Sequence, residues 1–290
     1  MSTLYDILMD ATRTLGLSIE YHDASLQAEL LLAHALTTTR AQVLARFDET
    51  ITPDVAARYT AMIARRANHE PLAYILGHQE FYGIDFIVDP RVLIPRHETE
   101  MLVLLVLQRM QCVPCASATI VDVGTGSGAL ALTLATHLPS AQIIATEISS
   151  DALAVARLNC VRLGLEKRVR FLQGDLLEPL DQPFDLLVAN LPYIPSGRLN
   201  QLSQEVRDYE PRLALDGGAD GFDLVRRLLR QMENHAARDA IAFFEISEEQ
   251  GAAATELFNQ QFPHALVMLH RDLEGLDRVI EIRFPDAERD

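Results

Sequence analysis

The feature that most constrains the fold of this chain is the alternation of short apolar runs with helical patterns over its second half. Five such runs are spaced far enough apart for a helix between most neighbours, and two more follow near the end. This alternation predicts a mainly parallel sheet covered by helices on both faces. A turn near Gly275 predicts that the last two strands form an antiparallel pair at the sheet edge. The predicted strands are residues 120–123, 142–146, 169–172, 184–189, 240–246, 265–269 and 279–284.

The residues before this region follow other patterns. From residue 4 to about 76 the apolar positions recur at helical spacing, for example at Leu26, Leu30 and Leu31, which predicts a small helical bundle. Short extended pieces at 81–83 and 86–88 then predict a β-hairpin linker. Thr99 is expected to cap the helix that follows it. We therefore predict a helical domain at 1–78, a hairpin linker at 79–96 and an α/β domain at 97–290.

The composition argues against several classes of function. The 290 residues include 41 acidic and 25 basic side chains, a formal charge of −16 that repels a nucleic-acid backbone. No cationic leader opens the sequence, and no run approaches the ~20 apolar residues of a membrane span. The three cysteines, at 112, 115 and 160, are too few for a disulfide framework or a zinc site. We expect a cytoplasmic protein that binds no metal, nucleic acid or membrane.

A glycine-rich segment, Gly124-Thr125-Gly126-Ser127-Gly128, directly follows the first predicted strand and opens a predicted helix at 129–137. Such a turn lets a ligand approach backbone N–H groups at a helix N-terminus, so it predicts a nucleotide-type site. The positions of Gly124, Gly126 and Ala129 also satisfy the dinucleotide fingerprint. The lysine of a phosphate-binding loop is missing from the segment.

Acidic residues near the glycine-rich segment favour S-adenosylmethionine over a dinucleotide as the cofactor. Asp122, Glu147 and Asp175 stand at or near three successive strand ends, where open α/β sheets bind ligands. Carboxylates suit the ribose hydroxyls and the ammonium group of S-adenosylmethionine, which carries no pyrophosphate. We expect Glu147 to bind ribose and Asp175 to lie on the adenine side. The predicted cofactor-binding residues are Asp122, Gly124, Thr125, Gly126, Gly128, Glu147, Asp175, Leu176 and Asn190.

The tetrapeptide Asn190-Leu191-Pro192-Tyr193 follows the fourth predicted strand and predicts the catalytic residues. The Asn190 side-chain oxygen and the Leu191 backbone carbonyl can each accept a hydrogen bond from one NH2 group. These two bonds would align the nitrogen lone pair with a methyl donor by positioning and electrostatics. Pro192 stiffens the turn, and Tyr193 offers an aromatic face to a planar amide or base. With the glycine segment upstream, the tetrapeptide predicts methyl transfer to a planar nitrogen.

Several longer segments resemble the release factor glutamine methyltransferases, the HemK/PrmC family, over essentially the whole chain. They are EPLAYILG at 70–77, EFYG at 80–83, VLIPRHETE at 92–100, EVRDYEPRLAL at 205–215 and GGADG at 217–221. The resemblance implies a Rossmann-like S-adenosylmethionine-dependent methyltransferase domain behind an N-terminal helical substrate-recognition domain. It also implies methylation of the side-chain amide nitrogen of the glutamine in the Gly-Gly-Gln motif of class I peptide-chain release factors. We expect a monomer.

The chain departs from the family pattern at a few positions. Leu191 stands where the family usually has proline, although its carbonyl remains available. His97 replaces the proline that commonly follows Arg96, and we expect it to serve packing or solvation. Glu147 and Leu176 occupy positions where other members carry Asp and an aromatic residue.

Other functions fit part of the pattern. A glutamine methyltransferase of a ribosomal protein shares most of the same segments. An adenine amino methyltransferase of DNA or RNA uses the same Asn-x-Pro-Tyr device on a flipped base, but it needs a basic recognition segment. Here the arginine pairs at 65–66 and 226–227 indicate ordinary helix surface. A catalytically silent scaffold that binds a release factor or ribosomal partner is the non-enzymatic alternative.

Overall fold

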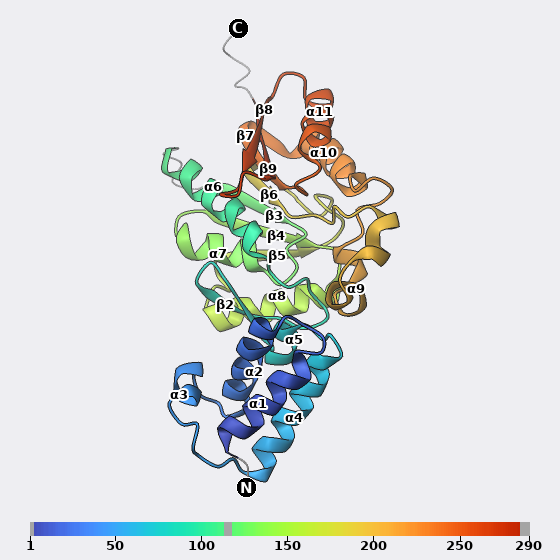
Figure 1. Ribbon diagram of the computed structural model, residues 1–290. Coiled ribbons are helices and arrows are strands. Elements are labelled where there is room, and N and C mark those ends of the chain that lie inside the picture. The colour runs from blue at the N-terminus through green and yellow to red at the C-terminus, as the bar shows by residue number, and fades with distance from the viewer. Residues whose placement is uncertain (1–2, 113–117, 285–290) are drawn as a thin grey trace. The chain divides into compact units, whose positions relative to one another are not determined.

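The computed structural model describes residues 3–112 and 118–284 (Figure 1). The chain forms two compact units, residues 1–78 with 203–209 and residues 79–202 with 210–290. Cys115, one of the two neighbouring cysteines, lies outside the described residues. Within the described ranges no helix is long and apolar enough to cross a membrane. The same ranges contain no group of three or more His, Cys, Asp or Glu side chains that could hold a metal ion.

Helices joined by short connections make up most of the first unit, as the apolar spacing predicts. They bury one cluster of side chains that includes Leu8, Leu31 and Ile63. The Tyr59 hydroxyl lies within this cluster and donates to the Ala28 carbonyl, which satisfies a polar group in an apolar core. The helices are α1 (Leu4–Leu15), α2 (Tyr21–Ala35), α3 (Arg40–Leu44), α4 (Pro53–Ala67) and α5 (Leu72–Leu76).

A short helix that is distant in the sequence, α9 (Gln204–Tyr209), belongs to the same unit. The Arg66 guanidinium is 3% exposed and pairs with the carboxylate of Glu205. The Tyr209 hydroxyl donates to the Asn68 carbonyl at 2.8 Å. These contacts attach a segment that follows the predicted catalytic tetrapeptide to the helical unit, an arrangement that the sequence pattern did not predict.

A β-hairpin follows α5 in the chain, as predicted, but its strands begin and end elsewhere. β1 spans His78–Phe81 and β2 spans Ile84–Ile87. Tyr82 and Gly83, which we expected to continue the first strand, instead form the turn, with φ of 51° and 75°. Two successive residues with positive φ match the right-handed twist of a two-residue hairpin, which explains the difference. The prediction of extended backbone at 82 and 83 was therefore wrong.

The second unit contains a seven-stranded sheet in the order β5-β4-β3-β6-β7-β9-β8. The first five strands in this order are parallel to their neighbours. β9 runs antiparallel to both β7 and β8, which confirms the predicted edge pair. β7 begins at Ala236 rather than at the predicted residue 240, because Ala236 pairs with Phe184 beyond an irregularity in the register. The strands are β3 (Thr119–Val123), β4 (Gln142–Glu147), β5 (Val169–Gln173), β6 (Phe184–Ala189), β7 (Ala236–Glu245), β8 (Leu266–Arg271) and β9 (Asp277–Arg283).

Helices cover both faces of this sheet (Figure 1). Alternate residues of a central strand enter different cores, because successive side chains of a strand point to opposite faces. On β6, Leu186 and Val188 pack with α6, α7 and α8, whereas Leu187 and Ala189 pack with α10 and α11. The bounds are α6 (Glu100–Cys112), α7 (Ala129–His137), α8 (Ser150–Leu163), α10 (Asp223–His235) and α11 (Gly251–Gln261).

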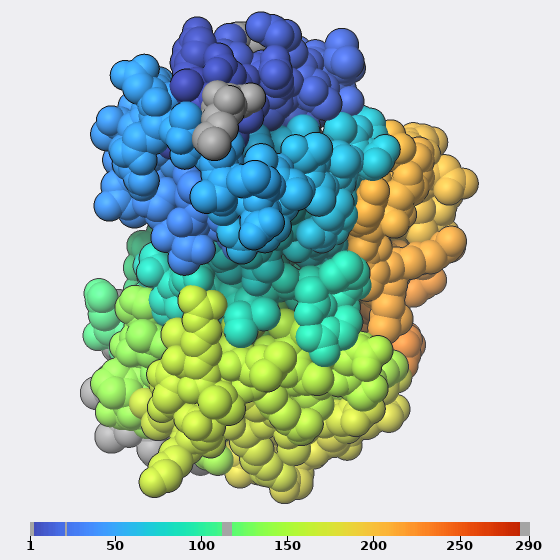
Figure 2. All heavy atoms as spheres, turned by 90° about the horizontal axis from the view of Figure 1, so that it is seen from below, coloured from blue at the N-terminus to red at the C-terminus, as the bar shows by residue number. Residues whose placement is uncertain are grey.

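Helix α8 has one exposed face and one that organises neighbouring loops. Its yellow-green residues reach the surface in Figure 2, and Leu158 and Val161 are half exposed or more. On the inner side, Asn159 is buried and accepts a hydrogen bond from the Ile87 N–H at 2.7 Å. Its amide donates to the carbonyls of Ile87 and Ser127 at 3.0 and 2.9 Å. Asn159 thus ties the hairpin to the glycine-rich segment.

Candidate active site

The site lies where the strand order reverses. β3 has β4 on one side and β6 on the other, although β6 follows β5 in the chain. The carboxyl ends of β3, β4 and β6 therefore bring Gly124, Glu147 and Asn190 to one edge of the sheet, where doubly wound sheets bind ligands. The cavity at this edge is lined by all three residues.

The glycine-rich turn is fixed to the neighbouring strand and to the tetrapeptide. The N–H groups of Gly124 and Thr125 donate to the Thr146 carbonyl at 2.9 and 3.0 Å. Gly124 has a φ of 75°, and a Cβ there would lie 3.1 Å from Leu191 Cδ2. A larger residue would strain the backbone and press on Leu191, so glycine allows the two predicted motifs to pack together.

Asp122 stabilises this turn through hydrogen bonds. Its Oδ2 accepts the Thr125 hydroxyl at 2.6 Å and the Ala131 N–H at 3.1 Å. Its Oδ1 is buried with no partner among the described residues, and burial raises the Asp122 pKa to about 7. Asp122, Thr125 and Gly128 do not line the cavity. The structure thus assigns these three predicted cofactor residues to shaping the turn, and their direct contact with cofactor stays a prediction.

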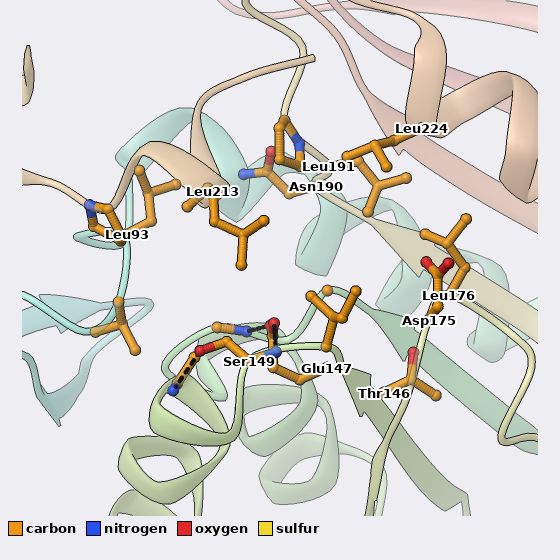
Figure 3. A pocket seen from close by; sticks show the side chains of 18 of the residues that line it. Leu93, Thr146, Glu147, Ser149, Asp175, Leu176, Asn190, Leu191, Leu213 and Leu224 are labelled. Atoms are coloured by element: carbon orange, nitrogen blue, oxygen red, sulfur yellow. Dashed lines mark hydrogen bonds between the residues drawn. The ribbon is translucent and has the colours of Figure 1, made fainter. Parts of the chain in front are cut away.

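Glu147 lies against the turn on the other side. Its Oε2 accepts the Gly126 N–H at 3.0 Å, and its Oε1 accepts the Ser149 N–H at 2.9 Å. Figure 3 shows these two bonds beside the cavity, across from Asn190 and Leu191. A carboxylate has about four acceptor positions, so each oxygen keeps capacity for a ligand hydroxyl.

Asp175 and Leu176 line a further side of the cavity, as Figure 3 shows. Asp175 forms an ion pair with Arg227, which also lines the cavity. Leu176 has a φ of 53°, which is uncommon for a residue with a branched side chain and is typical of functional loops. The second lining arginine, Arg91, pairs with Asp89 at 2.6 Å. Because both lining arginines are paired, neither offers an uncompensated cation to a pyrophosphate, which favours S-adenosylmethionine over a dinucleotide.

Asn190, Leu191 and Pro192 line the cavity opposite Glu147. The Asn190 amide donates to Thr99 Oγ1 at 2.9 Å, and within the described ranges its Oδ1 accepts no hydrogen bond. Thr99 lies in a 3-10 turn (His97–Thr99) before α6, and among the described residues its hydroxyl oxygen accepts no hydrogen bond from a backbone N–H at the start of that helix. The expectation of a capping role for Thr99 was wrong, because its hydroxyl is directed to Asn190.

Tyr193 is the predicted catalytic residue that does not line the cavity. Its hydroxyl lies 3.5 Å from Glu245 Oε1, and its backbone carbonyl accepts the Gln250 side-chain amide at 3.1 Å. Burial, followed by the charge of Glu245, raises the Tyr193 pKa. The phenol therefore stays protonated at neutral pH. An aromatic face for the acceptor remains a prediction for this residue.

Two buried carboxylates near the site were missed by sequence reasoning. Glu245, at the end of β7, is 4% exposed, and burial raises its pKa to about 7, although hydrogen bonding with Thr99 lowers it in part. Glu210 is also buried and accepts the Ile94 N–H at 3.2 Å while pairing with Arg96. An acid inside the apolar run 243–246 was the available signal for Glu245.

Most of the remaining cavity wall is apolar and comes from segments distant in the sequence. Leu93 and Leu213 lie on the side away from Asp175 and Leu176 (Figure 3). Sequence patterns did not identify these residues, because isolated leucines outside long helices and strands carry no periodic signal. The lining residues that were not predicted are Arg91, Val92, Leu93, Thr146, Ile148, Ser149, Ala152, Gly174, Pro211, Leu213, Ala214, Leu224 and Arg227.

The fold and the site together define a Rossmann-like S-adenosylmethionine-dependent methyltransferase. Residues 120–209 match a family model described as a methyltransferase domain, and residues 6–77 match one described as the PrmC N-terminal domain. The chain is 47% identical to the release factor glutamine methyltransferase of Moorella thermoacetica, over 87% of this chain and 89% of that protein. The corresponding protein of Geobacter sulfurreducens is 41% identical, over 94% of each chain. The chain belongs to the release factor glutamine methyltransferase family.

Solved structures agree with the fold. The catalytic domain of hMettl16 in complex with an RNA hairpin matches with a TM-score of 0.56 at 17% identity, over 78% of this chain and 83% of that one. A methyltransferase from Pyrococcus furiosus matches with a TM-score of 0.52 at 18% identity, over 78% and 99% of the two chains. At these identities the similarity concerns the architecture alone.

Proposed function

We propose that this protein transfers the methyl group of S-adenosylmethionine to the side-chain amide nitrogen of a glutamine in a class I peptide-chain release factor. The observation that carries the proposal is the Asn190 carboxamide, which lines the cavity while its NH2 group is engaged by Thr99. Its oxygen is thereby left as an acceptor for the NH2 group of a substrate. Membership of the release factor glutamine methyltransferase family supports this substrate.

Some of the residues that line the cavity would bind the cofactor, and others would bind the acceptor glutamine. Glu147 suits the ribose hydroxyls, and Asp175 and Leu176 suit the adenine side. The cofactor supplies an electrophilic methyl group on a sulfonium. An amide nitrogen is a poor nucleophile because its lone pair is delocalised. Asn190 Oδ1 and the Leu191 carbonyl would each accept one N–H of the glutamine and align that lone pair, after which the nitrogen loses its proton to water.

We further propose the finer features of recognition. The acceptor glutamine lies in the Gly-Gly-Gln motif, and residues 1–78 form the domain that helps hold the release factor. The hairpin linker at 79–96 joins it to the methyltransferase domain at 97–290. The charge of −16 supports a protein substrate rather than a nucleic acid. The protein is proposed to act as a monomer in the cytoplasm.

A methyl-transfer assay with several acceptors tests the proposal. Labelled S-adenosylmethionine is incubated with the full chain and a release factor, a release factor with its Gly-Gly-Gln glutamine substituted, ribosomal proteins or duplex DNA. Mass spectrometry then locates the methyl group. Label on the intact glutamine alone is the expected result, whereas label on a ribosomal protein or on adenine would replace the proposed substrate. Asn190→Ala serves as the control for transfer by this site.

A further inference from the structure

The loop that follows β5 lines the cavity with three successive residues, Gly174, Asp175 and Leu176. Its first residue is fixed to β4, because the Gly174 N–H donates to the Glu147 carbonyl at 3.0 Å. Leu176 has a φ of 53°, a conformation that costs free energy for a residue with a side chain and persists only where the surroundings support it. The shape of this loop therefore depends on the elements that contact it.

Helix α10 supports the loop through two side chains that are one helical turn apart. The Arg227 guanidinium donates to Asp175 Oδ2 and forms an ion pair with it. The Gln231 Oε1 atom accepts the Leu177 N–H at 2.7 Å. Residues four apart lie on the same face of a helix, so both contacts reach the loop from one side. They bind the residues directly before and after Leu176, the position with positive φ.

Apolar packing fixes α10 itself against the loop. Leu228 and Met232 of α10 are fully buried and belong to the same core cluster as Leu176 and Leu177. Packed interiors are dense and resist deformation. The two polar side chains of α10 that reach the loop therefore start from a rigid backbone.

The ion pair leaves one oxygen of Asp175 for a ligand. Among the described residues, Asp175 Oδ1 accepts no hydrogen bond, whereas Oδ2 is engaged by Arg227. The Asp175 and Arg227 side chains are 23% and 42% exposed, and an ion pair at such exposure contributes little to folding stability. The pair does restrict the carboxylate, which lies beside Leu176 at the cavity wall (Figure 3). This placement favours a role in ligand binding over one in stability.

Resting on the proposed function, we infer that Arg227 and Gln231 are positioning residues that hold Asp175 in the orientation that recognises the 6-amino group of the cofactor adenine. The amino group carries hydrogen-bond donors, and a carboxylate can only accept. A base with an oxo group at the same position would present an acceptor to Asp175 Oδ1, and two acceptors cannot share a hydrogen bond. Such a base is therefore rejected as long as the carboxylate is held in place.

Binding of two product analogues tests the inference in the full chain. S-adenosylhomocysteine carries the 6-amino group, and S-inosylhomocysteine carries an oxo group there. In calorimetry the wild type should bind the adenine analogue about tenfold or more tightly than the oxo analogue, the range for one hydrogen bond to a charged group. Arg227→Met removes the ion pair at similar side-chain length and should reduce this preference to about twofold or less. Arg227→Lys keeps a cation and should retain at least about half of the wild-type preference.

Arg226 offers a matched control on the same helix. It forms an ion pair with Asp220, as Arg227 does with Asp175, but it does not line the cavity. Arg226→Met should leave the preference for the adenine analogue within about twofold of the wild-type value. An equal change in Arg226→Met and Arg227→Met would indicate a general effect of altering α10 and would overturn the inference.

A double-mutant cycle separates positioning from direct contact, because Arg227 lines the cavity itself. Arg227→Met alone should lower the affinity for S-adenosylhomocysteine about tenfold. In an Asp175→Ala background the same substitution should change this affinity by less than about twofold, since the carboxylate that Arg227 positions is gone. An equal loss in both backgrounds would mean that Arg227 contacts the base directly, and the inference would be wrong.

Gln231 provides an independent test if Arg227→Met unfolds the protein. Gln231→Leu removes the acceptor of the Leu177 N–H and should lower the preference for the adenine analogue about fivefold. Gln231→Glu keeps an acceptor oxygen and should stay within about twofold of the wild type. An unchanged preference in Gln231→Leu would overturn the inference.

The same binding experiment distinguishes failure of the inference from failure of the proposed function. If the wild type does not bind S-adenosylhomocysteine, both are wrong. If it binds and the Arg227 and Gln231 variants keep the full preference for adenine, only the inference is wrong. Methyl transfer to an acceptor other than a release factor would overturn the proposed substrate alone, because the binding measurements involve no acceptor.

Discussion

Two buried acids, Asp122 and Glu245, lie near the two halves of the active site and differ in where their partners come from. Asp122 supports the glycine-rich turn through Thr125 and Ala131, three and nine residues along the chain. Glu245 is approached by the Tyr193 hydroxyl at 3.5 Å, and Thr99, which lowers the Glu245 pKa, is likewise far away in the sequence. Burial raises the pKa of both acids to about 7. The cofactor half is thus organised by a local segment, whereas the acceptor half depends on strands and loops that only folding brings together.

The largest effect is expected at Asn190, which we propose binds the substrate amide. Asn190→Ala removes the proposed acceptor of the substrate N–H and should lower kcat about a hundred- to thousandfold, as for loss of one preorganised polar group in other active sites. Cofactor affinity, measured by calorimetry, should change less than about twofold. Loss of both kcat and cofactor affinity would give Asn190 a structural role. It would also mean that the cofactor and acceptor halves of the site are not separate.

Glu147 tests the cofactor half. Glu147→Ala removes the carboxylate that binds the Gly126 and Ser149 N–H groups and should weaken S-adenosylmethionine binding about tenfold or more. Glu147→Asp keeps a carboxylate one methylene shorter and is the matched control, with a smaller expected loss. Unchanged affinity of Glu147→Ala in a binding titration would exclude it from the ribose site.

The two acids should also make folding stability depend on pH in the same direction. Their folded-state pKa values, about 7, lie above the ordinary values of 3.8 for Asp122 and 4.5 for Glu245. Between these limits the folded protein holds more protons than the unfolded chain, so these groups reduce stability as the pH rises toward and through 7. Asp122→Asn should therefore gain stability relative to the wild type between pH 5 and pH 8.

Thermal unfolding of Asp122→Asn at the two pH values provides the measurement, with Glu245→Gln as the companion variant. The Tm of each variant minus the Tm of the wild type should be about 2 °C or more higher at pH 8 than at pH 5. A constant difference would mean that the acid does not titrate in this range. A change in Asp122→Asn alone would sharpen the contrast between the two halves.

The smallest effect is expected for Leu191→Pro. Proline, the usual residue of the family, keeps the backbone carbonyl that we propose as the second acceptor and removes the Leu191 Cδ2 atom, which would lie 3.1 Å from a Cβ at Gly124. Transfer should stay within about fivefold of wild type, roughly 1 kcal/mol in the barrier, when kcat is compared at saturating acceptor. A much larger loss would show that the packing between the two motifs matters more than the carbonyl.

The sequence predicted features that are encoded by neighbouring residues. The sheet, its antiparallel edge and the helix Ala129–His137 follow from apolar periodicity, and the glycine turn follows from residues that tolerate positive φ. The hairpin was found but its turn was misplaced, because Tyr82 is an aromatic residue that favours strands yet occupies a turn position. Thr99 was misassigned because helix capping and long-range bonding use the same hydroxyl.

The sequence by itself determined the fold class, the family resemblance and the motifs that hold Gly124, Glu147 and Asn190, because these depend on periodicity and on spacing within short segments. Only the tertiary structure decided which oxygen of the site is free, that Tyr193 lies off the cavity and that its hydroxyl approaches Glu245. The physical reason is that hydrogen-bond direction and burial are set by the groups that surround a side chain. For this site those groups come from turns and strands far apart in the chain.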